Sequence, residues 1–159
     1  MTTDKEIVLS ALKKAGKAAS QSLQERAPEM DGTALIAEED YIITFDAAVK
    51  NANMLTRKVG FACQDGGQVW QLLQSYDSDT YTDRPANMRA QWSLAHTKDP
   101  KKAKPYVAPL GVSGAYKKDE CCTDAGHVYQ STYDGDNVWA PTAYPAGWKD
   151  LGTIQEIQK

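Results

Sequence analysis

The chain repeats the stretch Cys63-Gln64-Asp65-Gly66-Gly67-Gln68-Val69-Trp70-Gln71 as Cys122-Thr123-Asp124-Ala125-Gly126-His127-Val128-Tyr129-Gln130. The Cys, Asp, second Gly, Val and final Gln are identical in the two stretches, and Trp70 stands opposite Tyr129. An internal repeat of this kind indicates that one structural unit is present twice. The repeat therefore decides the fold of the C-terminal part of the chain.

Each copy is expected to form a small three-stranded antiparallel unit. The turns Asp65-Gly66-Gly67 and Asp124-Ala125-Gly126 provide residues that can adopt positive φ, which a tight hairpin requires. In both copies a third strand is expected at a tryptophan that follows a proline by seven residues, Trp92 after Pro85 and Trp148 after Pro141. Because a unit of about 40 residues has little core, one large aromatic side chain dominates it. The two tryptophans are the candidates for this role.

The N-terminal residues predict a helix. Thr3 and Glu6 have the spacing of a capping box, and Pro28 ends the pattern. Between them an apolar stripe recurs at helical spacing, through Val8, Leu9, Leu12, Ala15, Gly16, Ala19 and Leu23. A stripe this narrow makes a marginal helix alone, so it is expected to pack against either the rest of the chain or a neighbouring subunit. Residues 33–49 form a further element, a helix or a strand, which the pattern does not decide.

The predicted fold class is α+β, an N-terminal helix followed by two small three-stranded antiparallel β modules. Residues 1–54 are expected to be a helical attachment or oligomerisation region, since acidic residues exceed basic ones only there and every tryptophan follows it. The first module spans residues 55–97 and the second module spans residues 113–152. Residues 98–112, rich in lysine and proline, are expected to be a solvated linker.

Composition excludes several classes of protein. The formal net charge of −3 removes the attraction to phosphate that nucleic-acid-binding proteins show. No apolar run approaches the roughly 20 residues that cross a bilayer, and the first residues lack the order of a signal peptide. Three cysteines, two of them adjacent, do not make a secreted disulfide framework. We therefore expect neither nucleic acid nor membrane as a partner, and we expect reduced thiols.

Catalytic patterns are missing from the sequence. His96 and His127, the two histidines, lie far apart in the chain, and no CxxC, GxSxG, P-loop or GxGxxG motif occurs. The segment Asp134–Asn137 begins like a calcium loop, but Trp139 stands at the sixth position, where glycine is required. The sequence therefore predicts a protein that is not an enzyme and that carries no cofactor or metal.

The second module resembles a known family. The resemblance rests on the hairpin turn and four other segments, Ala115–Glu120, Val128–Ser131, Asp136–Pro141 and Tyr144–Trp148. These segments are similar to the small chitin-binding-type carbohydrate-binding modules, which are three-stranded and rich in aromatic residues. A similar arrangement, a helix followed by two such modules, occurs in short bacteriophage and prophage proteins. The first module departs from the pattern at Val59–Ala62 and at the polar insertion Asp77–Arg84, which implies that it keeps the fold without the ligand site.

The resemblance implies a non-catalytic virion accessory protein of a tail, baseplate or head fibre. Such a protein binds a polysaccharide, either chitin-like or a bacterial cell-surface glycan, and contacts other virion proteins as a homo-oligomer. Its location is the virion, after assembly in the host bacterial cytoplasm. Two alternatives stay open. One is a structural virion decoration or adaptor that binds no sugar, and the other is a detached chitin-binding accessory of a glycan hydrolase system.

The resemblance also implies a candidate glycan site in the second module. Sugar sites combine aromatic faces for the apolar side of a pyranose ring with polar groups for its hydroxyls. Tyr133, Trp139 and Tyr144 are the candidate rings, and Asp136 and Asn137 are the candidate hydrogen-bonding residues. Weaker equivalents in the first module are Tyr76, Asp77 and Tyr81. In so small a module the same rings are equally suited to the core, so their exposure and coplanarity separate the glycan-binding and structural interpretations.

Overall fold

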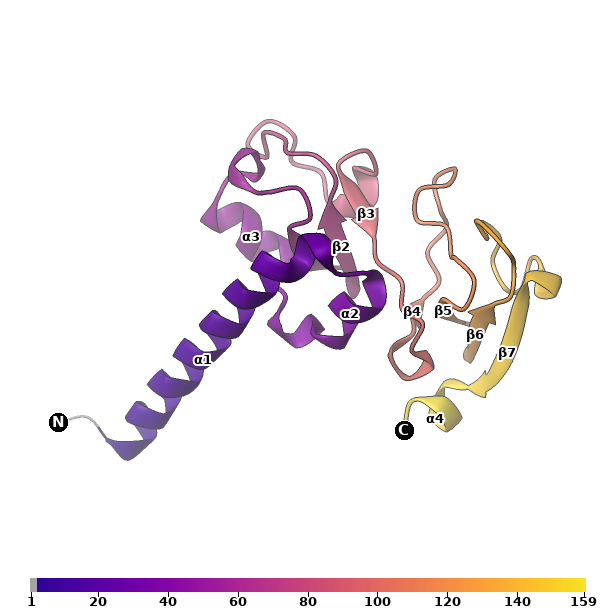
Figure 1. The fold of residues 1–159 in the computed structure, drawn as a ribbon, viewed down its shortest axis with the longest axis horizontal. Helices are drawn as coiled ribbons and strands as arrows, with labels where there is room; N and C mark the ends of the chain where they lie inside the picture. Colours follow the sequence, from indigo (N-terminus) through magenta and orange to yellow (C-terminus); the bar gives the residue numbers. More distant parts are fainter. Residues whose placement is uncertain (1–2) are drawn as a thin grey trace.

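The first helix forms as the capping box predicts. In this computed structural model, which describes residues 3–159, helix α1 runs over Asp4–Arg26. The Thr3 hydroxyl accepts from the Glu6 amide at 3.2 Å, and the Thr3 amide donates to the Glu6 carboxylate at 2.7 Å. The N-terminal half of α1 stands clear of the body of the protein (Figure 1). Its apolar side chains, which include Val8 and Leu12, are exposed.

Two sheets follow the helical region and confirm the α+β class. The first sheet has the order β1-β2-β3, all antiparallel, from Ala62–Asp65, Gln68–Leu72 and Trp92–Leu94. The second sheet has the order β4-β5-β6-β7, from Lys104–Pro105, Cys121–Asp124, His127–Ser131 and Trp148–Thr153. Strand β4 is parallel to β5, and the other neighbours are antiparallel.

The predicted equivalence of the two modules is confirmed in their registers. Cys63 pairs with Trp70 in the first hairpin, and Cys122 pairs with Tyr129 in the second. Both tight turns use positive φ, at Gly66 and Gly67 in the first and at Ala125 and Gly126 in the second. The two third-strand tryptophans also occupy matching positions. Trp92 pairs with Leu72 and Trp148 pairs with Ser131, and these two partners stand at the same place after the repeated hairpin.

The end of α1 packs on one face of the first sheet. Leu23, Ala27, Leu35, Ile36 and Ile42 form one apolar cluster with Ala62 and Val69. Two glutamine side chains also join the end of α1 to the first sheet by hydrogen bonds. The Gln24 side chain bonds both backbone groups of Ala62, and the Gln71 side chain donates to the Ala27 carbonyl at 2.7 Å. Residues from about Leu23 to 54 are therefore part of the first module's core. Only the earlier part of α1 fits the expected separate attachment region.

Residues 33–49 fold as helices rather than as a strand. Helix α2 covers Gly32–Ala37, a 3-10 turn covers Glu39–Tyr41, and helix α3 covers Phe45–Asn51. Each α-helix has a side-chain cap, because Asp31 accepts from the Ala34 amide and Thr44 accepts from the Ala47 amide. A capping residue three positions before the amide that it bonds is a sequence feature that favours a helix over a strand.

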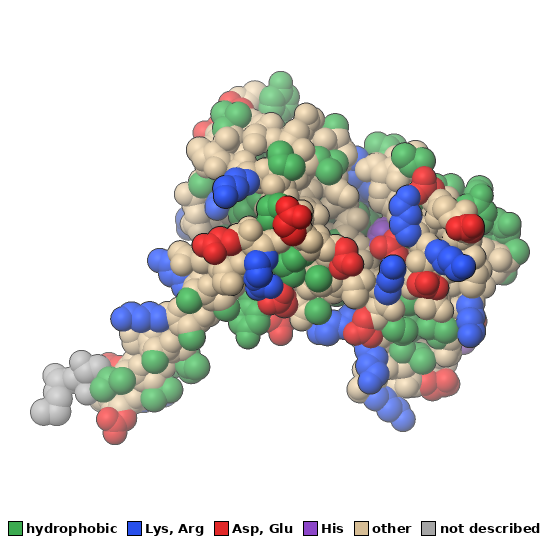
Figure 2. Space-filling view, viewed as in Figure 1, with side chains coloured by type: hydrophobic (Ala, Val, Ile, Leu, Met, Phe, Trp, Pro, Cys, Tyr) green, Lys and Arg blue, Asp and Glu red, His purple; other side chains and the backbone are tan. Residues whose placement is uncertain are grey.

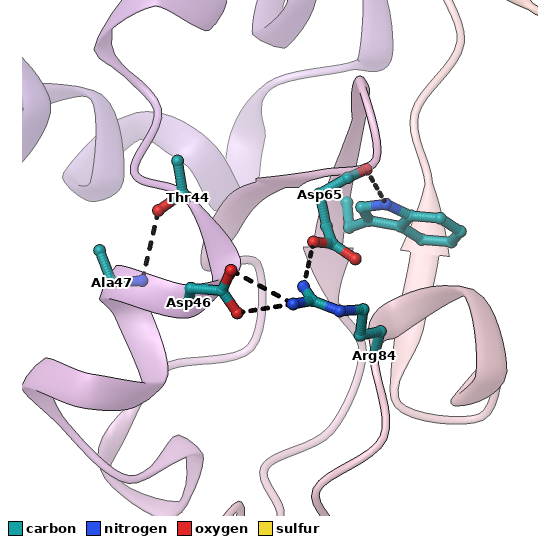
Figure 3. Close-up of polar contacts among 6 residues, drawn as sticks. Thr44, Asp46, Ala47, Asp65 and Arg84 are labelled. Carbon is teal, nitrogen blue, oxygen red and sulfur yellow. Dashed lines mark hydrogen bonds and ion pairs between the residues drawn. The ribbon is translucent and has the colours of Figure 1, made fainter.

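The other face of the first sheet carries the main core, centred on Trp92. This side chain lies with Phe45, Met54, Tyr76 and Leu94 in one buried cluster. The last residue of the polar insertion Asp77–Arg84 binds it to the rest of the first module. Arg84 donates to Asp65 at 2.6 Å and to both oxygens of Asp46, which joins the insertion to the hairpin turn and to α3 (Figure 3).

Two parts of the second sheet differ from the expectation. The segment 98–112, expected to be a linker, is ordered and supplies β4, whose Lys104 side chain donates to Gly67 and pairs with Glu39 of the first module. The chain also continues beyond residue 152 into helix α4, Ile154–Ile157. Leu151, Ile154 and Ile157 pack against Ala103, Cys121 and Val128. Both additions cover apolar surface that a three-stranded module would leave open.

The two modules pack against each other through His96 and Tyr116. Their rings are stacked with centroids 3.6 Å apart, and the Cys121 amide donates to the Thr97 carbonyl at 2.7 Å. Tyr106 also stacks on Tyr116, with the ring centroids 5.5 Å apart. No helix within residues 3–159 has the length and apolar character needed to cross a membrane.

Candidate functional site

Three aromatic rings gather on the loop between β6 and β7. Tyr133, Trp139 and Tyr144, here called the Trp139 cluster, come from residues 132–147 at the outer end of the second module. Trp139 is the most exposed of the four tryptophans, with 41% of its surface accessible, while Tyr133 and Tyr144 are half-buried. Figure 2 shows hydrophobic side chains exposed at the outer edge of this module. The sequence therefore identified three residues that the fold does bring together.

The core of the module holds Trp139 in its exposed position. The indole N–H of Trp148 donates to the Trp139 carbonyl at 2.9 Å, and Trp148 itself is buried against Tyr116. The Trp139 amide donates to the Asn137 side-chain oxygen at 3.3 Å. Both backbone groups of Trp139 are thus hydrogen-bonded to the module, while its side chain is exposed.

Asn137 does not act as a surface hydrogen-bonding residue. Its side chain is fully buried, and its amide group donates to the Ser131 hydroxyl and the Gly147 carbonyl, both at 3.1 Å. Its backbone also exchanges two hydrogen bonds with Tyr116. Asn137 therefore ties the base of the loop to the module and has no group left for a ligand. This result removes Asn137 from the candidate ligand residues.

Asp136 lies at the surface but is already paired. Its carboxylate forms an ion pair with Lys117, and both side chains remain partly exposed. A sugar hydroxyl at this place would meet a carboxylate and an ammonium group together. Lys117 is thus a residue of the candidate site that the sequence reasoning missed. In the sequence, Lys117 stands at the same distance before the second hairpin as Lys58 stands before the first. That correspondence marks Lys117 as part of the repeat but gives no reason to pair it with Asp136.

The three rings do not form a flat platform. The planes of Tyr133 and Trp139 meet at 74° with centroids 5.5 Å apart, and those of Trp139 and Tyr144 meet at 79° with centroids 5.1 Å apart. Edge-to-face packing of this kind stabilises aromatic clusters. Rings at such angles cannot stack side by side on a row of sugar units, so Trp139 is the one exposed ring face of the cluster to consider.

The first module lacks an equivalent cluster. Tyr76 is buried, and its hydroxyl accepts from the Trp92 indole N–H at 3.1 Å. Asp77 caps its own loop, and the hydrogen bonds from Thr80 and Asn53 lower the pKa of this carboxyl. Tyr81 is 61% exposed and has no aromatic neighbour among the described residues. The three copy-one candidates lie on one loop, where the Tyr81 amide donates to the Asp77 carbonyl at 2.9 Å, but they do not form an exposed cluster of rings.

The indole N–H of the third-strand tryptophan has a different kind of acceptor in each module. In the second module it bonds a backbone carbonyl, which leaves the Trp139 side chain free to point outward. In the first module it bonds a tyrosine hydroxyl, which holds the Tyr76 ring inside the core. The same donor at equivalent positions thus contacts an exposed residue through its backbone in one copy and a buried ring through its hydroxyl in the other.

The remaining reactive groups are structural. Cys63, Cys121 and Cys122 are free thiols, and burial raises the pKa of each, so the nucleophilic thiolate is disfavoured at neutral pH. The His96 ring is buried between the modules, and the exposed His127 ring contacts Asp150 at 3.0 Å. Within residues 3–159, no three His, Cys, Asp or Glu side chains come close enough to hold a metal ion.

Comparisons with known proteins leave the family open. No protein-family model matches the chain, and no curated protein matches it in sequence.

Proposed function

We propose that this protein is a non-catalytic virion accessory protein whose second module binds one sugar ring of a surface glycan at Trp139. The observation that carries the proposal is the exposed Trp139 ring, held in place from behind by Trp148 and flanked by Tyr133 and Tyr144. An exposed indole on a fixed backbone is suited to the apolar face of a pyranose. The adjoining Lys117–Asp136 pair offers both donors and acceptors to its hydroxyls.

The virion context rests on the resemblance to short phage proteins with a helix before tandem modules. The first module has a scaffold role in this proposal, because Tyr76 is inside the core and the exposed Tyr81 has no aromatic neighbour among the described residues. The glycan is chitin-like or part of a bacterial cell surface.

Binding of the full chain to insoluble chitin and to bacterial cell-wall polysaccharide tests the proposal. Trp139→Ala is expected to weaken the affinity roughly 5- to 30-fold, since stacking on one aromatic ring contributes on the order of 1–2 kcal/mol. Tyr81→Ala is the control, because it removes a still more exposed aromatic ring, one that belongs to the first module and has no aromatic neighbour among the described residues. It is expected to bind like the unmodified protein.

A structural decoration or adaptor protein without sugar binding is the second candidate function. The nearly perpendicular rings of the Trp139 cluster favour it, because they resemble local packing as much as a ligand surface. Equal retention of the unmodified protein and Trp139→Ala on both polysaccharides, or retention of neither, would favour this candidate over glycan binding.

Homo-oligomerisation through α1 is part of the proposal. Val8, Leu12, Ala15 and Ala19 form a stripe at alternating spacings of four and three residues, and Lys13, Lys14 and Lys17 lie away from it. A second copy covers this uncharged stripe, while the lysines stay in water. Deletion of residues 1–16 is expected to convert an oligomer to a folded monomer, as measured by light scattering and circular dichroism. A monomeric full chain would contradict this part of the proposal.

A further inference from the structure

A groove of about 860 Å³ lies at the base of α1, on the side of the molecule that belongs to the first module. The last turns of α1 form one wall, with Lys17, Gln21 and Glu25. The end of α3, with Asn51, and the segment that follows it, with Arg57 and Lys58, form the other wall. Its volume falls in the range of sites that hold small organic ligands. The groove is separate from the Trp139 cluster, which lies on the second module.

The groove concentrates positive charge on a chain whose net charge is negative. Lys17, Arg57 and Lys58 line it against one acidic residue, Glu25. Within residues 3–159, none of these three cations forms an ion pair. Three unpaired cations around one concave surface attract an anion more strongly than scattered surface charges do.

Neutral groups of the module fix the Arg57 side chain, which has no acidic partner among the described residues. Its guanidinium lies 4.4 Å from the centre of the Phe61 ring, and one terminal nitrogen donates to the Ala48 carbonyl at 3.2 Å. Its Nε is buried and has no hydrogen-bond partner among the described residues. A fixed guanidinium is the usual element for binding carboxylate and phosphate groups.

The geometry points to this groove as a binding site for an acidic oligosaccharide, one whose sugar units carry carboxylates. The three cations bind the carboxylates, and the side chains of Gln21 and Asn51 bind hydroxyls. An acidic peptide suits the groove less well, because the Phe61 face that would receive an apolar side chain is covered by Arg57. The inference does not depend on sugar binding at Trp139.

Calorimetric titration of the full chain with oligogalacturonate tests this site, at low and high salt. The double variant Lys17→Gln/Lys58→Gln is expected to bind at least about tenfold more weakly, because it removes two of the three cations. Lys101→Gln/Lys102→Gln makes the same charge change at two exposed lysines outside the groove, and should leave affinity unchanged. Glu25→Gln is expected to tighten binding roughly twofold, since it removes the one opposing charge.

Several results would overturn the inference. Equal affinity of the unmodified protein and Lys17→Gln/Lys58→Gln would do so, as would equal binding of an uncharged galactose oligomer of the same length. Tight binding of oligoglutamate without binding of oligogalacturonate would assign the groove to an acidic peptide instead. Trp139→Ala is expected to bind oligogalacturonate normally, which keeps this test independent of the proposed glycan site.

Discussion

Replacement of Trp92 by alanine is expected to destabilise the protein by about 3–5 kcal/mol, the range for deleting a large aromatic side chain from a core. Trp92 is fully buried, with Phe45 and Tyr76 edge-on to its ring at centroid distances of 6.0 and 6.3 Å. The substitution empties the centre of the largest cluster of the first module and removes the donor to the Tyr76 hydroxyl. A loss of this size is a large part of the stability of a small protein.

Urea unfolding at neutral pH measures this effect. Tyr41→Ala is the matched control, because Tyr41 is an exposed aromatic residue of the same region, and its removal should change stability by less than about 0.5 kcal/mol. Trp92→Phe keeps an aromatic ring between Phe45 and Tyr76 and should lie between the two. Similar stability losses for Trp92→Ala and Tyr41→Ala would show that the first module is not organised around this tryptophan.

Acidification is expected to destabilise the protein through His96. Burial lowers the pKa of His96 from 6.5 to about 4; the nearby Arg89 charge contributes to the shift, and the hydrogen bond to the Gly114 carbonyl opposes it. Because the folded-state pKa lies below the unfolded value, the unfolded chain binds the proton more readily between these pH values. Stability from this group is therefore complete above about pH 6.5 and is lost as pH falls toward 4. The loss amounts to roughly 3 kcal/mol, since each pKa unit corresponds to about 1.4 kcal/mol.

The His96→Gln variant isolates this contribution from the titration of carboxylates. Its stability is expected to be lower than that of the unmodified protein at pH 7, and the difference should shrink steadily toward pH 4. His127→Gln is the control, because His127 is the other histidine and its ring is exposed beside Asp150. If the stability curves of the unmodified protein and His96→Gln stay parallel from pH 7 to pH 4, His96 does not titrate differently in the folded protein.

Features fixed by a few neighbouring residues could be predicted from the sequence. The two hairpin turns need positive φ at defined positions, which three glycines and Ala125 supply. The capping box places the start of α1, and the two third-strand tryptophans are buried in their modules. Each of these predictions uses a requirement that the local chain must meet in any surroundings.

Features that depend on distant neighbours could not be predicted in the same way. Asn137 is polar and lies among exposed residues, yet its side chain is buried because Ser131 and Gly147 offer it partners. Strand β4 has two residues, one of them Pro105, which gives no strand signal. The groove at the base of α1 joins Lys17 to Arg57 and Lys58 across a contact that no local pattern indicates.

Tryptophan fluorescence tests the central claim, that Trp139 is the ligand-contacting ring, most directly. Trp70, Trp92 and Trp148 are buried, so acrylamide should quench mainly Trp139. Saturating chito-oligosaccharide or soluble cell-wall fragments are expected to protect this fluorescence in the unmodified protein and to change nothing in Trp139→Ala. Quenching that stays the same at every concentration of both ligands, in a folded protein, would contradict the assignment of Trp139 as a glycan-binding residue.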